Sequence, residues 1–209
     1  LISEKQPQLF LIADGLGGHA DGEVASLYAV ENLSKEFYEK KPFEINSSIA
    51  SVHTKLTIDG RLSAKPMGTT IVGLILENNT ATFFNVGDSR GYIINGAAIK
   101  QITHDDHSVH HEQNVISKCL GGGVSLPIAS KSTQEYNFQS SFLLVSDGIS
   151  NWVSEEKLEK IKEDNSDQDF FSGIKICKKK RIGPARAEDN RPLFYKKDIS
   201  LLARNGFDF

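Results

Sequence analysis

The chain has 209 residues, which favours one sizeable domain over two small ones. Its 39% hydrophobic and 24% charged residues are typical of soluble globular proteins and disfavour disorder, collagen, coiled coils and small disulfide scaffolds. The net charge of -3 argues against general attraction to nucleic acid or anionic lipid, and no apolar run reaches the roughly 18 residues of a membrane span. The two cysteines, Cys119 and Cys177, do not show the spacing of a metal cluster or a disulfide framework, which favours a reducing compartment such as the cytoplasm.

The first third of the chain predicts a strand, a glycine-rich loop and two helices. The apolar run 8–13 ends at an Asp-Gly turn pair and predicts a buried strand. After the loop, residues 23–40 place an apolar side chain on one helical face at every fourth position. Residues 46–59 show the same helical spacing behind Asn46, a favourable N-cap.

The middle of the chain is rich in β-branched and aromatic residues separated by turn-forming pairs. Residues 69–76, 80–86 and 90–94 predict three consecutive strands, which we interpret as a β-meander. The pair Asn95 and Gly96 predicts a hairpin after the third strand, because a type I′ turn needs positive φ at both central residues.

The last third predicts two more strands and one more helix. The strands cover about residues 141–146 and 199–203, and the helix covers about residues 155–163 behind Ser154 as its cap. Because the helices come as a pair and the strands as a group, the predicted fold class is α+β, with antiparallel sheets covered by helices.

Aspartates stand at the ends of three predicted strands. Asp14 follows the first strand, Asp147 follows the strand at 141–146, and Asp198 precedes the last strand. A carboxylate at a rigid strand end is partly desolvated, and several together suit Mg²⁺ or Mn²⁺. An ordinary turn is the commoner explanation for any one of them. Two of the predicted strands are followed directly by an Asp-Gly pair, and the first of these pairs opens a glycine loop. This repeated arrangement favours the metal site.

A series of motifs carries a resemblance to a known family. They are FLIADGLGGHA at 10–20, GEVAS at 22–26, MGTT at 67–70, NVGDSR at 85–90, QIT at 101–103, DHS at 106–108, LGG at 120–122 and LVSDG at 144–148. In order and spacing they resemble the bacterial type 2C metal-dependent serine/threonine protein phosphatases over residues 9–161. The resemblance implies an antiparallel β-sandwich with helices on both outer faces and a two-metal centre at one edge.

The resemblance also implies roles for individual residues. Asp14 would bridge two Mn²⁺ or Mg²⁺ ions, with the carbonyl of Gly15 as a further ligand, and Asp147 matches the second carboxylate of the first metal. Asp106 matches the ligand of a third, weaker ion that Asp147 shares. A hydroxide between the metals would attack phosphorus in line. His19 is the nearest candidate proton donor to the leaving alkoxide, although it serves equally well to order the glycine loop.

Two segments depart from the family pattern. Residues 1–8 match neither the phosphate-gripping arginine nor the Asn-Glu-Asp segment of the family, so we expect that the natural N-terminus is missing. Near the end, a gapless match puts Asp198 one residue after the last metal ligand, and a shift of one residue turns a strand side chain to the opposite face. Asp198 therefore needs a local bulge to bind metal, and Asp189 is the fallback. The segment 174–195 is unlike the family.

Several conspicuous residues have simpler interpretations. We interpret Asp88 and Arg90 as ties between strands rather than a phosphate clamp. The histidines within 104–111 match no standard tetrahedral zinc spacing. We interpret Cys119 as a small core residue and Trp152 as a packing residue.

The sequence thus predicts a single catalytic domain over residues 1–209 that acts on phosphorylated proteins with two, or three, Mn²⁺ or Mg²⁺ ions. We expect a monomer in the cytoplasm, with no nucleic-acid or membrane partner. The alternative is a phosphatase-like binding or regulatory module with an incomplete metal centre. Binding of nucleic acid through the basic run in 177–191 is a third possibility that the acidic charge of the whole chain disfavours.

Overall fold

The computed structural model describes residues 6–16, 20–106, 116–164, 194–195 and 200–204. Its first half contains β1 (Gln8–Ala13), α1 (Ala20–Glu39), α2 (Ile45–Leu62), β2 (Gly68–Thr69), β3 (Ile71–Glu77), β4 (Thr80–Val86), β5 (Arg90–Asn95) and β6 (Ala98–Gln101). Its second half contains β7 (Leu120–Gly121), β8 (Ser130–Glu135), β9 (Ser140–Val145), α3 (Asp147–Ser150), α4 (Glu155–Asp164), β10 (Phe194–Tyr195) and β11 (Ser200–Arg204).

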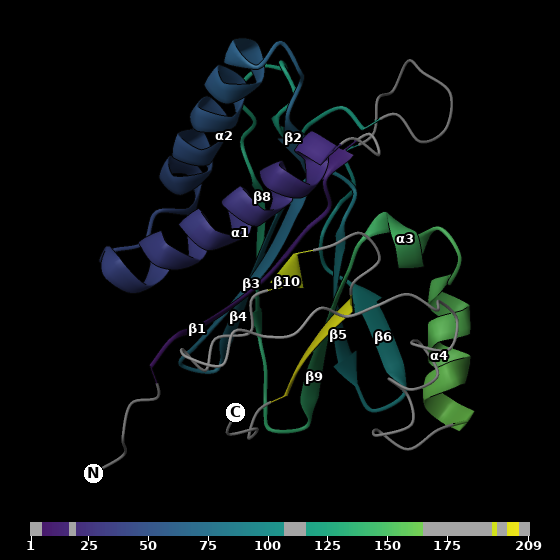
Figure 1. Cartoon of the computed structure of the whole chain (residues 1–209). Coiled ribbons are helices and arrows are strands. Elements are labelled where there is room, and N and C mark those ends of the chain that lie inside the picture. The colour runs from purple at the N-terminus through teal and green to yellow at the C-terminus, as the bar shows by residue number, and fades with distance from the viewer. Residues whose placement is uncertain (1–5, 17–19, 107–115, 165–193, 196–199, 205–209) are drawn as a thin grey trace.

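Two main sheets face each other, with helices outside them (Figure 1). The first sheet has the order β10-β1-β3-β4-β8 and the second has the order β11-β9-β5-β6, while β2 and β7 form a short separate ladder. Among the described strands, all pairings are antiparallel except that of β1 with β10. The α+β prediction and the helix-flanked sandwich are therefore confirmed.

The core consists of three apolar layers, and β1 contributes to two of them. Leu9 and Leu11 pack toward α1 and α2, whereas Phe10 and Ile12 pack between the two sheets against side chains of β9. Successive strand residues point to opposite faces, so a strand covered on both faces needs a continuous apolar run. The third layer lies between the second sheet and α4, where Leu158 is buried.

The two long helices cover the first sheet, as their apolar spacing predicts. The predicted N-cap of α2 is wrong, however. Glu44 occupies the cap position without a side-chain hydrogen bond, and Ile45 is drawn into the helix by its contact with the core. The side-chain oxygen of Asn46 instead accepts a hydrogen bond from the backbone N–H of Ala129 at 3.1 Å, which ties α2 to the segment before β8.

The predicted β-meander is also wrong, because the three strands do not lie in one sheet. β3 and β4 form a hairpin whose turn residues, Asn78 and Asn79, have φ of 48° and 60°. β4 and β5, by contrast, belong to opposite sheets. The chain crosses between them after Gly87, whose φ of 106° gives a sharp turn that few other residues adopt.

The predicted hairpin between β5 and β6 is confirmed, but its loop is shifted by one residue. Asn95 pairs with Ala98, so the loop residues are Gly96 and Ala97. Gly96 has a φ of 62°, but neither Asn95 nor Ala97 has a positive φ, so the predicted type I′ turn is wrong.

The predicted strand at 141–146 and helix at 155–163 match β9 and α4 within one residue. The cap of α4 is confirmed, since the Ser154 hydroxyl accepts a hydrogen bond from the backbone of Lys157 at 3.4 Å. Cys119 is buried as expected. Trp152 was expected to pack, but its side chain is 73% exposed. No helix in the described part of the chain has the length and apolar character to cross a membrane.

Candidate active site

Asp14 follows β1 and is held through its backbone. Its N–H donates to the hydroxyl of Thr70 at 3.2 Å, and its carbonyl accepts from the N–H of Thr70 and the hydroxyl of Thr69, both at 2.9 Å. The residue is only 6% exposed. Because β1 is buried on both faces and its end is fixed by these bonds, the Asp14 carboxylate projects from a rigid support.

Glycines bring the first turn of α1 against the end of β1. Gly15 forms an isolated bridge with Thr69, and a Cβ atom built on Gly15 would clash with the carbonyl oxygen of Gly22. A Cβ atom on Gly22 would in turn lie 2.8 Å from the carbonyl oxygen of Leu16. Only residues without side chains therefore allow this close approach, which places the start of α1 beside Asp14.

Asp106 lies beside the turn that joins the two sheets. Its Oδ2 atom accepts the N–H of Gly87 at 3.0 Å, and its own N–H donates to the carbonyl of Gly87, also at 3.0 Å. Its Oδ1 atom accepts from the Lys118 ammonium at 2.6 Å. The Asp106 side chain is 9% exposed, so this carboxylate is nearly enclosed by its partners.

Hydrogen bonds connect the surroundings of Asp14 to this turn. The hydroxyl of Thr70 that binds the Asp14 backbone also shares a hydrogen bond with the hydroxyl of Ser89 at 2.8 Å. Gly87 packs against the same threonine, since a Cβ atom there would lie 2.7 Å from the Thr70 methyl group. Thr70 therefore links Asp14 to the turn that holds Asp106.

The same turn leads to Asp147. Arg90 follows Ser89 and pairs with Val145, the last residue of β9. Two residues later, Asp147 begins α3, and its carbonyl accepts a hydrogen bond from the N–H of Asn151 at 3.0 Å. The ends of β1 and β9 thus lie at one edge of the sandwich, where α1 and α3 begin (Figure 1).

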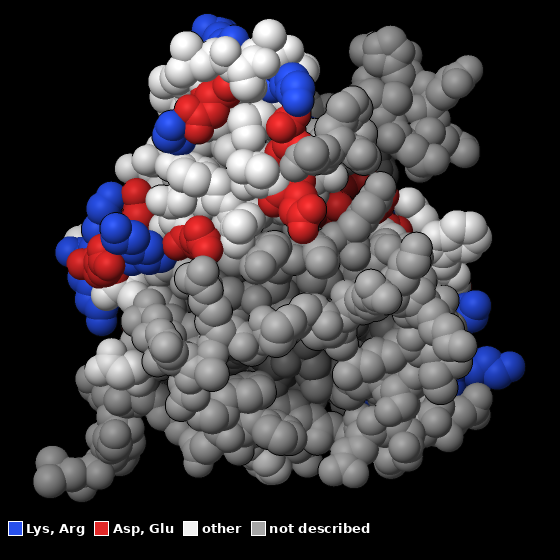
Figure 2. Space-filling model, in the orientation of Figure 1, with Lys and Arg blue, Asp and Glu red and all other residues white. Residues whose placement is uncertain are grey.

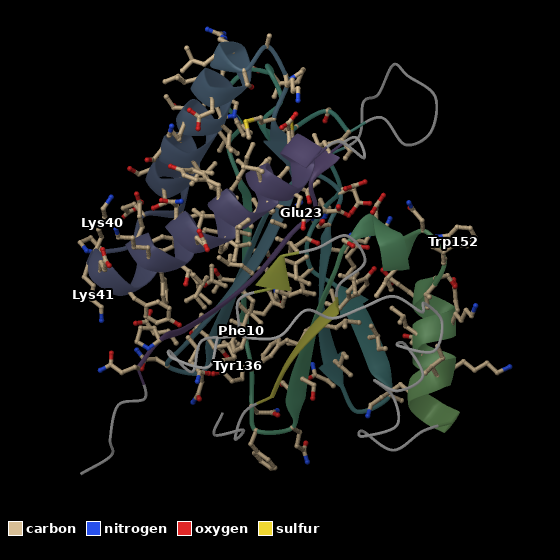
Figure 3. All side chains as sticks on the ribbon, viewed as in Figure 1. Phe10, Glu23, Lys40, Lys41, Tyr136 and Trp152 are labelled. Atoms are coloured by element: carbon tan, nitrogen blue, oxygen red, sulfur yellow. The ribbon has the colours of Figure 1, made fainter. Side chains whose placement is uncertain are left out.

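This edge has an acidic character. Asp21 and Glu23 lie in the first turn of α1, and Figure 2 shows acidic side chains grouped at this end of the molecule. Glu23 lies on α1 at the end where the helix begins (Figure 3). Among the described residues, no three carboxylate, imidazole or thiolate side chains come close enough together to hold a metal ion. The structure brings Asp14, Asp106 and Asp147 to one edge without forming a closed set of ligands there.

Several residues singled out in the sequence lie outside the described part of the chain. These are His19, Asp189, Asp198 and the histidines at 107, 110 and 111. His104 is described and is exposed. The predicted roles of His19 and Asp198 therefore stay predictions.

Arg90 makes the structural tie that the sequence suggested. Its Nε and Nη2 atoms donate to the Asp105 carboxylate at 2.9 and 2.7 Å, and the side-chain amide of Gln101 donates to the same carboxylate at 3.1 Å. Such a two-pronged pair fixes the orientation of both side chains. It fastens β5 to the segment after β6 and engages the Nε and Nη2 donors of Arg90.

Sequence reasoning missed two residues at this edge. Thr70 was visible in the MGTT motif, but nothing in the motif showed that its hydroxyl joins Asp14 to Ser89. Lys118 had no sequence signal, because its partner Asp106 precedes it by twelve positions and the contact depends on the path of the intervening segment.

Comparisons with known proteins decide the family. The family model described as protein phosphatase 2C matches residues 2–179 of the chain. The chain belongs to the protein phosphatase 2C family. The serine/threonine phosphatase stp of Listeria innocua is 31% identical over 216 residues, covering 90% of this chain and 82% of that protein.

Solved structures of this phosphatase family have the same fold. Stp1 from Staphylococcus aureus superposes with a TM-score of 0.72 and 26% identity, covering 82% of this chain and 78% of that one. The serine/threonine phosphatase PstP/Ppp of Mycobacterium tuberculosis gives a TM-score of 0.64 and 26% identity, with 74% of each chain covered. The chain is thus a protein serine/threonine phosphatase of a metal-dependent family, and a catalytically impaired module is not favoured.

Proposed function

We propose that this phosphatase hydrolyses phosphoserine and phosphothreonine with two or three Mn²⁺ or Mg²⁺ ions held at the edge where β1 and β9 end. Asp14, the carbonyl of Gly15 and Asp147 would hold the first two ions together with Asp198, and Asp106 would hold the third. The observation that carries the proposal is the set of hydrogen bonds through Thr69, Thr70 and Ser89, which joins the support of Asp14 to the residue just before β5, the strand that pairs with β9.

The residues at this edge fit hard divalent cations. Carboxylate and carbonyl oxygens are the ligands that Mg²⁺ and Mn²⁺ prefer. Asp14 is almost completely buried, and a buried carboxylate is stabilised by nearby positive charge or hydrogen-bond donors. The Gly15 backbone is fixed against Gly22 and Thr69, so its carbonyl is also held in one place.

The chemistry divides between the ions and the protein. Bound ions would acidify a water molecule and offset the charge of the phosphoryl oxygens. The protein holds its ligands in advance, because Thr69 and Thr70 fix the Asp14 backbone before substrate arrives, and such preorganisation avoids a cost in the transition state. His19 is the candidate donor of a proton to the leaving serine or threonine alkoxide.

Asp14→Asn tests the proposal directly. We expect hydrolysis of p-nitrophenyl phosphate and of a phosphothreonine peptide, both assayed with Mn²⁺, to fall by about 100-fold or more, since removal of one electrostatic group from an active site commonly has this effect. The matched control is Asp59→Asn, which removes an aspartate from a partly exposed ion pair with Lys55 on α2 and should leave the rate unchanged. Equal rates for wild type and Asp14→Asn, with unchanged circular dichroism, would contradict the proposal.

We also propose that residues 1–209 form a single domain that acts as a monomer in cytoplasmic signalling through phosphoprotein substrates. β1 contributes to two of the three apolar layers, which supports a single domain, and the buried free thiol of Cys119 suits a reducing compartment. Light scattering on the purified chain tests the monomer, and a mass of twice 23.1 kDa would contradict it.

A further inference from the structure

Both carboxylate oxygens of Asp106 are already engaged. Oδ2 accepts the N–H of Gly87 at 3.0 Å, and Oδ1 accepts the Lys118 ammonium at 2.6 Å. The Lys118 side chain is 41% exposed, whereas that of Asp106 is 9% exposed. The negative charge of a nearly buried carboxylate is therefore matched by one lysine, whose remaining surface faces solvent.

The backbone around Lys118 is anchored on both sides. The N–H of Ser117 donates to the carbonyl of Asp106 at 2.8 Å, which holds the lysine close to its partner. Cys119 and Leu120 on the other side are buried, and Leu120 pairs with Thr69 across β2 and β7. The backbone of Lys118 is thus fixed close to Asp106, whereas its flexible side chain can turn outward into solvent.

We propose that Lys118 competes with the third divalent cation for Asp106. The inference rests on the proposed function, because it assumes that Asp106 is a metal ligand. An ammonium and a divalent cation cannot both occupy Oδ1, and their like charges repel at short range. The third ion therefore binds only when the Lys118 side chain turns away into solvent. Breaking the Lys118–Asp106 ion pair costs free energy, and this cost weakens the binding of the third ion. Lys118 is a positioning residue that keeps this ion weak and exchangeable.

Calorimetric titration with Mn²⁺ tests the competition without an activity assay. We expect Lys118→Met to tighten the weakest Mn²⁺ site about fivefold, which corresponds to about 1 kcal/mol for the loss of a half-exposed ion pair. The tight sites should change little. Lys40→Met is the matched control, because Lys40 also pairs with a carboxylate, that of Glu36 at 2.8 Å, but lies at the far end of α1 (Figure 3).

Three further variants and a measurement of thermal unfolding make the result decisive. Lys118→Gln is a second neutral variant for the case that Lys118→Met unfolds, and thermal unfolding without metal checks both. Lys118→Arg keeps the charge and should keep the weak site weak. Asp106→Asn should remove the weakest site in the wild-type and Lys118→Met backgrounds alike, which assigns that site to Asp106.

The outcomes separate the two proposals. Two tight Mn²⁺ sites with an unchanged or weaker third site in the neutral Lys118 variants would overturn the competition and leave the proposed function standing. The competition is also wrong if the Lys118→Met effect persists in the Asp106→Asn background. A wild-type chain that binds no Mn²⁺ would instead overturn the proposed metal centre.

Discussion

His53 is a buried histidine that makes the stability of the fold depend on pH. It lies on α2, is 6% exposed, and its Nδ1 atom accepts the N–H of Gly121 at 3.1 Å. Burial lowers the pKa of the imidazole, against a smaller opposing effect of a hydrogen bond with the backbone of Cys119. A protonated Nδ1 would also lose its role as the acceptor for Gly121, so the folded protein requires the neutral ring.

The sign of the effect follows from proton binding in the two states. An unfolded chain protonates His53 near its ordinary pKa of about 6.5, whereas the folded chain does so only at lower pH. The unfolded state therefore binds more protons just below that pKa, and stability falls as pH falls through this window. We expect His53→Asn, whose amide oxygen can accept the Gly121 N–H, to show a shallower loss of melting temperature from pH 7.5 to 5.5 than wild type. Parallel curves would contradict this role.

A single buried glycine governs the packing of β3 against β4. Gly73 lies opposite Phe84 in the ladder, and a Cβ atom on Gly73 would clash with the Phe84 ring, which is fully buried under the helices. We expect Gly73→Ala to lower the free energy of unfolding in urea by about 2 kcal/mol, the usual effect of overpacking. Gly73→Ala combined with Phe84→Leu should lose less than the sum of the two single variants. Strict additivity would show that the two residues do not contact.

How well each element could be predicted depended on whether its residues are apolar. β1 and β4 were predicted at their observed bounds, because β1 is an apolar run and β4 combines β-branched threonines with buried aromatic residues. β8 was missed, since its sequence SKSTQE contains no apolar residue and the strand lies at the edge of its sheet. The sheet change after Gly87 was also missed, because a turn between two strands gives no local sign of whether they will pair.

The candidate site was also predictable only in part. Aspartates at strand ends were visible in the sequence, and the ends of β1 and β9 do lie at one edge. The contacts that join them were not visible, because the Thr70–Ser89 and Asp106–Lys118 bonds connect residues that are neighbours only after folding. Sequence motifs thus singled out the candidate ligands but not the network that positions them.

At the scale of the whole molecule, the proposed ions would lie between two sheets that otherwise contact mainly through apolar side chains. Asp14 extends from the first sheet and Asp147 follows the second, while the layer between the sheets is formed by residues such as Ile12, Val72 and Leu144. Ions that bind both aspartates would bridge the sheets at their edge. Metal binding at this proposed site would therefore be coupled to folding, because the unfolded chain does not hold these aspartates together.

This coupling predicts that Mn²⁺ stabilises the fold. At a concentration about 100 times its dissociation constant, a ligand of the folded state adds about 2.7 kcal/mol, which for a chain of this size raises the melting temperature by about 5–10 °C. We expect EDTA to reverse the shift in wild type and Asp14→Asn to abolish it, while the Asp59→Asn control on α2 keeps it. A melting temperature that does not respond to Mn²⁺ in wild type would mean that the two aspartates do not share ions. An equal shift in Asp14→Asn would mean that the stabilising ions bind elsewhere, since the bridge between the sheets depends on that carboxylate.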